Sequence, residues 1–73
     1  VSHMKETVTN KVYALRSNAG ATQEQLAEAV GVTRQTIIAI EKGNYVPSVL
    51  LALKIAHFFK GPVEEVFSIK NVK

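Results

Sequence analysis

The chain has 73 residues, enough for one domain with a marginal hydrophobic core. It contains no cysteine, which excludes disulfides and thiolate metal sites and is compatible with a reducing cytoplasm. The net charge of +3 permits a nucleic-acid partner, and no apolar run approaches the roughly 18 residues that span a bilayer. Residues 1–3, which precede Met4, are typical of a cleaved expression tag, so we expect a single domain over residues 4–73.

The first predicted helix covers residues 7–17. Val8, Val12 and Leu15 recur there at helical spacing, and Gly20 is a natural left-handed terminator.

Two further helices follow with a very short connection. The second opens at Thr22, which forms a capping box with Gln25. The third covers residues 34–42 and begins at a second capping residue, Thr33, directly after Gly31. So short a connection predicts a sharp crossing of the two helices, as in a helix-turn-helix.

The remaining sequence predicts a fourth and a fifth helix. Ser48 caps the fourth, which runs to about Phe59 and is apolar on most of its circumference. One apolar stripe holds Val49, Ala52, Leu53, Ala56 and Phe59, and a second holds Leu51, Ile55 and Phe58. The short fifth helix covers residues 63–67, and residues 68–73 form a frayed end or a short strand.

The third helix is expected to present an acid-free face to solvent. Ile37, Ile40 and Glu41 share the inward side. The outward side carries Gln35, Ala39 and Lys42, flanked by Arg34, Thr36 and Ile38. Such a face suits the major groove, where a carboxylate would be repelled by phosphates.

Four of these residues are candidates for base contacts. The Gln35 amide can pair with both edge atoms of adenine, and Arg34 can pair similarly with guanine. Ala39 would let the backbone approach the bases, and Ile38 could touch a thymine methyl group. An isolated glutamine is usually only a solvated surface residue, but the position of Gln35 at the start of a capped helix after a tight turn favours recognition.

Other residues are candidates for phosphate contacts. Gln23 stands at the N-terminus of the second helix, where free N–H groups and the helix dipole favour an anion, although it is otherwise an ordinary first-turn residue. We also expect Thr33 and Lys42 to contact phosphates. Asn44 and Tyr45 could reach the DNA backbone beyond the third helix, or Tyr45 could close its loop onto the core.

Residues 22–48, TQEQLAEAVGVTRQTIIAIEKGNYVPS, resemble the Cro/C1-type (xenobiotic-response-element) helix-turn-helix regulators of bacteria and phages. The similarity continues through LKIA at 53–56 and EEVF at 64–67, so it covers nearly all of the chain after Met4. It implies an all-α fold: a five-helix, lambda-repressor-like domain whose third helix is the recognition helix.

The resemblance also implies residue roles. Arg34, Gln35 and Ala39 take base-contacting positions, Gln23, Thr36 and Asn44 take phosphate positions, and Arg16 pairs with Glu41. The ion pair agrees with the inward position of Glu41, because a buried carboxylate needs a partner. Ala21, where a larger aliphatic residue is usual, and Ile38, which replaces a small or polar residue, depart from the family pattern.

Regulators of this kind usually bind as two-fold dimers with half-sites about 34 Å apart. The residues expected to form a homodimer interface are Leu51, Ile55, Phe58, Val66, Phe67 and Ile69. Alternatively, some of them complete the core against the fifth helix. A C-terminal strand around residues 67–69 could pair across the two-fold axis.

The predicted function is sequence-specific binding of double-stranded DNA by a cytoplasmic transcriptional regulator, more specifically a repressor. A protein-interaction module and an antitoxin-like, partner-dependent DNA binder are the alternatives. We expect no enzyme activity, metal or cofactor, because the sequence offers no nucleophile, phosphate loop or ligand cluster.

Overall fold

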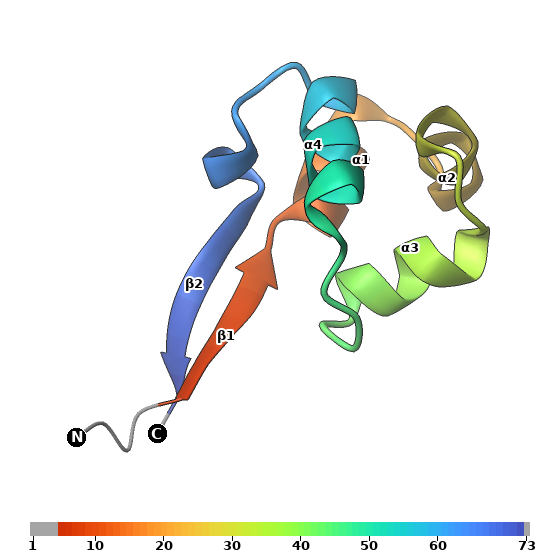
Figure 1. Cartoon of the computed structure of the whole chain (residues 1–73). Coiled ribbons are helices and arrows are strands. Elements are labelled where there is room, and N and C mark those ends of the chain that lie inside the picture. The colour runs from red at the N-terminus through yellow and green to blue at the C-terminus, as the bar shows by residue number, and fades with distance from the viewer. Residues whose placement is uncertain (1–4, 73) are drawn as a thin grey trace.

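The order of secondary structure in the chain is strand, four α-helices, one helical turn and strand (Figure 1). The computed structural model describes residues 5–72, so the expected tag remnant at residues 1–3 lies outside the described residues. The elements are β1 (Lys5–Asn10), α1 (Val12–Ala19), α2 (Gln23–Val30), α3 (Arg34–Glu41), α4 (Val49–Phe58), a 3₁₀ turn (Val63–Glu65) and β2 (Phe67–Val72). No helix within residues 5–72 is long and apolar enough to cross a membrane.

The two ends of the described chain form an antiparallel β-ribbon, β1 with β2, that projects from the helices (Figure 1). The prediction that the first helix begins near residue 7 is therefore wrong, since α1 begins at Val12. Val8 belongs instead to a Thr-Val-Thr run of β-branched residues, which favour strands, and it pairs with Ile69. Asn10 ends the strand, and its side-chain oxygen accepts a hydrogen bond from the Val12 N–H at 3.1 Å.

The C-terminal part also corrects the expected five-helix, all-α architecture. The predicted fifth helix is only the 3₁₀ turn, because Phe67 leaves the helical path to pair with Asn10. The described residues thus hold four α-helices and a two-stranded sheet. The possible C-terminal strand is present as β2, but its partner here is β1 of the same chain and not a strand across a two-fold axis.

The hydrophobic core lies where the four helices meet the 3₁₀ turn. Its buried residues are Val12, Leu26, Ala27, Val30, Ile37, Ile40, Leu51, Ile55, Ala56 and Val66. Leu51, Ile55 and Val66 were expected at a dimer interface, and that prediction is wrong because they are buried within a single chain. Among the other predicted interface residues, Phe58 is half-buried and packs edge-to-face on Phe59.

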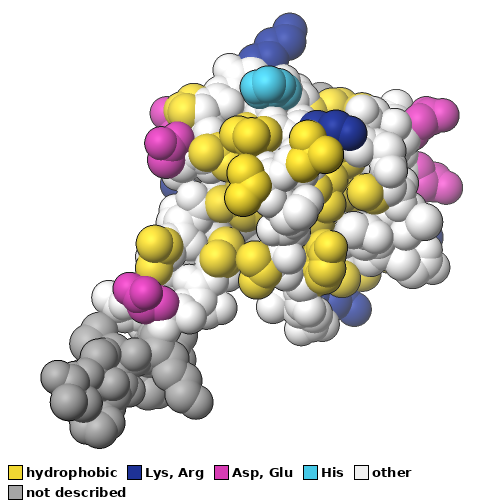
Figure 2. Space-filling model, viewed as in Figure 1, with side chains coloured by type: hydrophobic (Ala, Val, Ile, Leu, Met, Phe, Trp, Pro, Cys, Tyr) yellow, Lys and Arg dark blue, Asp and Glu magenta, His cyan; other side chains and the backbone are white. Residues whose placement is uncertain are grey.

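Helix α4 packs into the core a stripe that was predicted for the dimer interface. Val49, Leu50 and Leu53 are 76 %, 64 % and 41 % exposed, whereas the stripe containing Leu51 and Ile55 faces the core. When a helix is apolar on most sides, its periodicity alone does not determine which face is buried. In α4 the buried face is determined by packing against α2 and the 3₁₀ turn. Figure 2 shows the resulting cluster of hydrophobic side chains over α4.

The turn between α2 and α3 depends on Gly31. Gly31 has φ of 79°, and its N–H closes α2 by donating to the carbonyl groups of Ala27 and Glu28. An L-residue in this left-handed conformation costs about 1–2 kcal/mol. A Cβ at position 31 would meet no atom within 4 Å, so the cost is conformational and not steric.

We therefore expect Gly31→Ala to lower the free energy of unfolding by about 1–2 kcal/mol in urea titrations followed by circular dichroism. Gly61→Ala is the matched control, because the φ of Gly61 is not positive and an added Cβ would make an ordinary 3.4 Å contact with the Glu65 carboxylate. It should change stability by less than about 0.5 kcal/mol. Equal losses in the two variants would contradict this account of the turn.

Candidate nucleic-acid interface

The two helices of the candidate interface are fixed at their N-termini by side-chain caps. Thr22 Oγ1 accepts from the Gln25 N–H at 3.0 Å, and Gln25 Oε1 accepts from the Thr22 N–H at 2.9 Å, which completes the predicted capping box. Thr33 Oγ1 caps α3 by accepting from the Thr36 N–H at 3.3 Å. The caps make the start of each helix a local property of the sequence.

Helix α3 has one buried and one exposed side. Ile37 and Ile40 are fully buried, while Arg34 and Gln35 are exposed in the first turn. Ile38 and Ala39, the other two residues predicted to contact bases, are half-buried in the next turn. The one acidic residue of α3, Glu41, points inward, so the exposed side of this helix carries no negative charge.

Apart from Gln23 on α2, the residues predicted to contact phosphates lie at the two ends of α3. Thr33 and Thr36 stand at its start with their hydroxyl groups 3.2 Å apart. Lys42, Asn44 and Tyr45 follow its end and are exposed, Tyr45 by 46 %. Base contacts in the middle and phosphate contacts on both flanks are the arrangement that a recognition helix uses in the major groove.

Gln23 and Arg34 are brought together from different helices. They line one open hollow of about 520 Å³, together with Arg16, Thr22 and Glu24. The amide of Gln23 is also engaged inside the protein, because its Nε2 donates to Glu41 Oε1 at 3.0 Å. Gln23 thus belongs both to the candidate interface and to its supporting network.

That network joins α1, α2 and α3. The expected ion pair is formed, with Arg16 Nε donating to Glu41 Oε2 at 2.7 Å and Nη2 donating to Oε1 at 3.2 Å. Arg16 Nη1 donates in addition to the Ala21 carbonyl at 3.0 Å. The side chains of Arg16 and Glu41 are only 13 % and 7 % exposed. The hydrogen bond to Glu41 raises the pKa of Arg16, against a smaller opposing effect of burial, so the guanidinium stays charged at any physiological pH.

Sequence reasoning missed one residue of this scaffold. Asn10 Nδ2 donates to the Ile40 carbonyl at 2.9 Å and so ties the base of the β-ribbon to the end of α3. Because Asn10 was assigned to the interior of a helix, its role went unnoticed. An asparagine two residues before an apolar helical run was the available signal.

Comparisons with known proteins agree with this geometry. The family model for helix-turn-helix proteins, HTH_3, matches residues 12–66, which span α1 to the 3₁₀ turn. An uncharacterised HTH-type transcriptional regulator of Bacillus subtilis, YgzD, is 62 % identical over 62 residues, covering 85 % of this chain and 94 % of YgzD. The transcriptional repressor RstR of the cryptic phage CTXphi, from Vibrio cholerae, is 33 % identical over 60 residues, covering 82 % of this chain and 54 % of RstR.

A solved structure extends the similarity to the fold. The restriction-modification controller protein C.AhdI from Aeromonas hydrophila superimposes with a TM-score of 0.71 at 29 % identity, over 75 % of this chain and 83 % of C.AhdI. The fold, the acid-free exposed side of α3 and these relatives all indicate a DNA-binding helix-turn-helix protein. This chain belongs to the Cro/C1-type helix-turn-helix family of DNA-binding transcriptional regulators.

Proposed function

We propose that this protein binds a specific two-fold-related operator as a homodimer, with α3 in the major groove of each half-site, and represses transcription. The observation that carries the proposal is the exposed side of α3, which is free of acidic residues and has polar residues at both ends. Helix α3 lies at the periphery of the helical part of the molecule (Figure 1), where a duplex can approach it.

In this arrangement the first turn of α3 carries most of the specificity. Arg34 and Gln35 are exposed and long enough to pair with purine edges, Arg34 with guanine and Gln35 with adenine. Ala39 lies one turn further on and lets the helix approach closely, while Ile38 contacts a thymine methyl group. Lys42 and Asn44, beyond the C-terminal end of α3, contact the phosphate backbone of the DNA.

Gln23 performs a double task. Its amide nitrogen carries two hydrogens, and the bond to Glu41 uses one of them. The second hydrogen remains for a phosphate at the N-terminus of α2, where the helix dipole attracts negative charge. The network from Arg16 through Glu41 thereby orients a phosphate contact as well as the recognition helix.

Repression and dimerisation are supported by different observations. RstR, a relative by sequence, is named a repressor, and a protein that occupies an operator blocks polymerase without needing further parts. A two-fold dimer doubles the contact with DNA, which a single 8-residue recognition helix needs for high affinity. Action on cellular DNA places the protein in the cytoplasm.

The test is selection of bound sequences from a random duplex pool, followed by fluorescence anisotropy of the best site at several salt concentrations. We expect a two-fold-related sequence and an affinity that falls steeply with salt, because phosphate contacts release counterions. Weak binding without an enriched sequence would contradict the proposal and would favour a protein-docking role or a partner-dependent, antitoxin-like one.

A further inference from the structure

One side of the molecule carries hydrophobic side chains that the fold leaves uncovered. Val49, Leu50 and Leu53, which we call the α4 face, lie along one side of α4, and Val46 just before the helix is 57 % exposed. In Figure 2 hydrophobic side chains cluster over α4 and continue toward the β-ribbon. A contiguous exposed apolar surface of this kind marks an interaction site.

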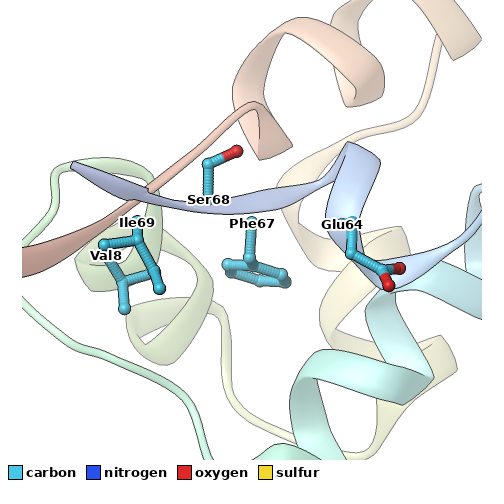
Figure 3. A pocket seen from close by; sticks show the side chains of 5 residues that line it. All are labelled: Val8, Glu64, Phe67, Ser68 and Ile69. Carbon is cyan, nitrogen blue, oxygen red and sulfur yellow. The ribbon is translucent and has the colours of Figure 1, made fainter.

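The β-ribbon continues this surface because its two faces differ. Val8, Phe67 and Ile69 project from the same face, while Ser68 points away from it (Figure 3). Together with Glu64 they line an open hollow of about 410 Å³. Ile69 is 72 % exposed, so the outer part of this face has no cover. The opposite face is polar and includes exposed Thr7, Thr9 and Lys70.

A projecting two-stranded ribbon is marginally stable in water on its own and needs a hydrophobic face packed against something. Within the described residues, the inner end of the ribbon is held by Phe67, half-buried on the core, and by the Lys11 N–H, which donates to the Val66 carbonyl at 2.9 Å. Among residues 6–71, no comparable contact supports the outer end.

We propose that a second copy of this chain covers the α4 face and the apolar face of the β-ribbon together, with the leucines of each α4 face packed against the hollow of the other copy. The inference rests on the homodimer of the proposed function and assigns its surface. The surface is self-complementary, since it offers a convex helix beside a concave hollow, as a two-fold interface requires.

Charge supports the second copy as the occupant. Glu64 lines the hollow at the ribbon, whereas Lys54 lines a second hollow with Tyr45 and Leu50 on the side of α4 that faces α2. A two-fold axis running along α4 exchanges these sides and brings Lys54 of each copy opposite Glu64 of the other. Opposite charges at such positions fix the register of an interface.

The same axis suits DNA binding. In Figure 1 the ribbon and the pair α2–α3 lie on opposite sides of α4, and α3 lies toward one end of that helix. A rotation about an axis along α4 leaves both copies of α3 at the same end of the dimer. Both recognition helices then face one duplex, and each ribbon crosses onto its partner.

The first test compares substitutions on the two faces of the ribbon by sedimentation equilibrium. Ile69→Asp should raise the dimer dissociation constant at least tenfold, because it places a charge in the apolar contact of both copies. Thr7→Asp, on the opposite face, should leave the constant unchanged. On the helices, Leu50→Asp should act like Ile69→Asp, and Ala29→Asp on the exposed surface of α2 is its control. Circular dichroism confirms that each variant is folded.

The second test is charge reversal. Lys54→Glu and Glu64→Lys should each weaken the dimer about tenfold, and the double variant should recover most of the loss. If the wild-type protein is a dimer and none of these substitutions raises its dissociation constant, the assigned surface is overturned but the homodimer is not. A wild-type monomer that selects a sequence without two-fold symmetry would instead overturn the homodimer itself.

Discussion

Replacing Glu41 by alanine is expected to lower the free energy of unfolding by about 2–3 kcal/mol, although Glu41 belongs to the recognition helix and touches no predicted DNA contact except Gln23. The carboxylate accepts from the guanidinium of Arg16 at 2.7 and 3.2 Å and from the Gln23 amide at 3.0 Å. Its loss leaves the largely buried charge of Arg16 without an anion. Breaking a fully buried pair costs about 3–5 kcal/mol, and the remaining exposure of Arg16 reduces this figure.

Such a loss is a large part of the stability of so small a domain, and it should lower Tm by about 10–20 °C. Thermal and urea unfolding measure it, with Glu28→Ala, an exposed carboxylate on α2, as a control that shifts stability by less than about 0.5 kcal/mol. The double variant Arg16→Met with Glu41→Leu should lose less than the two single changes summed, since neither charge is left unpaired. A Glu41→Ala protein as stable as wild type would show that the network does not hold α1, α2 and α3 together.

The helix-turn-helix could be predicted from sequence because its signals are local. Thr22 with Gln25, Gly31 and Thr33 each specify a helix end by their own chemistry, and α2 and α3 begin and end within a residue or two of the predicted positions. The inward turn of Glu41 followed from helical periodicity, and its pairing with Arg16 from the family resemblance. The third member of that network, Gln23, was predicted only as a phosphate contact, because a helix wheel does not show contacts between helices.

The β-ribbon and the orientation of α4 could not be predicted in the same way. Val8 fits a helical pattern with Val12 as well as a strand, and only pairing with Ile69 from the other end of the chain decides between them. Leu51 and Leu53 are equally apolar, so only the shape of the rest of the core buries the first and exposes the second. Of the residues predicted for the dimer surface, Leu51, Ile55 and Val66 are therefore in the core, Phe58 and Phe67 are half-buried, and Ile69 is exposed.

Removing either predicted purine contact should weaken operator binding strongly. Arg34→Ala and Gln35→Ala should each cost about 1–3 kcal/mol per half-site, because a bidentate contact to a base is lost. In a two-fold dimer each substitution acts twice, so the expected loss of affinity is about 30-fold or more. Both side chains are exposed in the first turn of α3, so neither substitution should change Tm appreciably.

The measurement is fluorescence anisotropy on the selected operator and on sites with one base pair changed in each half. Loss of a base contact relaxes specificity at one position, so Gln35→Ala should bind wild-type and altered sites almost equally at that position. Lys42→Gln should instead weaken all sites alike and reduce the salt dependence, because a phosphate contact carries no sequence information. Lys60 follows α4 at the end of that helix that lies away from α3 (Figure 1). Lys60→Gln removes one positive charge, as Lys42→Gln does, and should change neither the affinity nor its salt dependence. If Lys60→Gln weakened binding as much as Gln35→Ala, the duplex would have to lie on a different surface from α3.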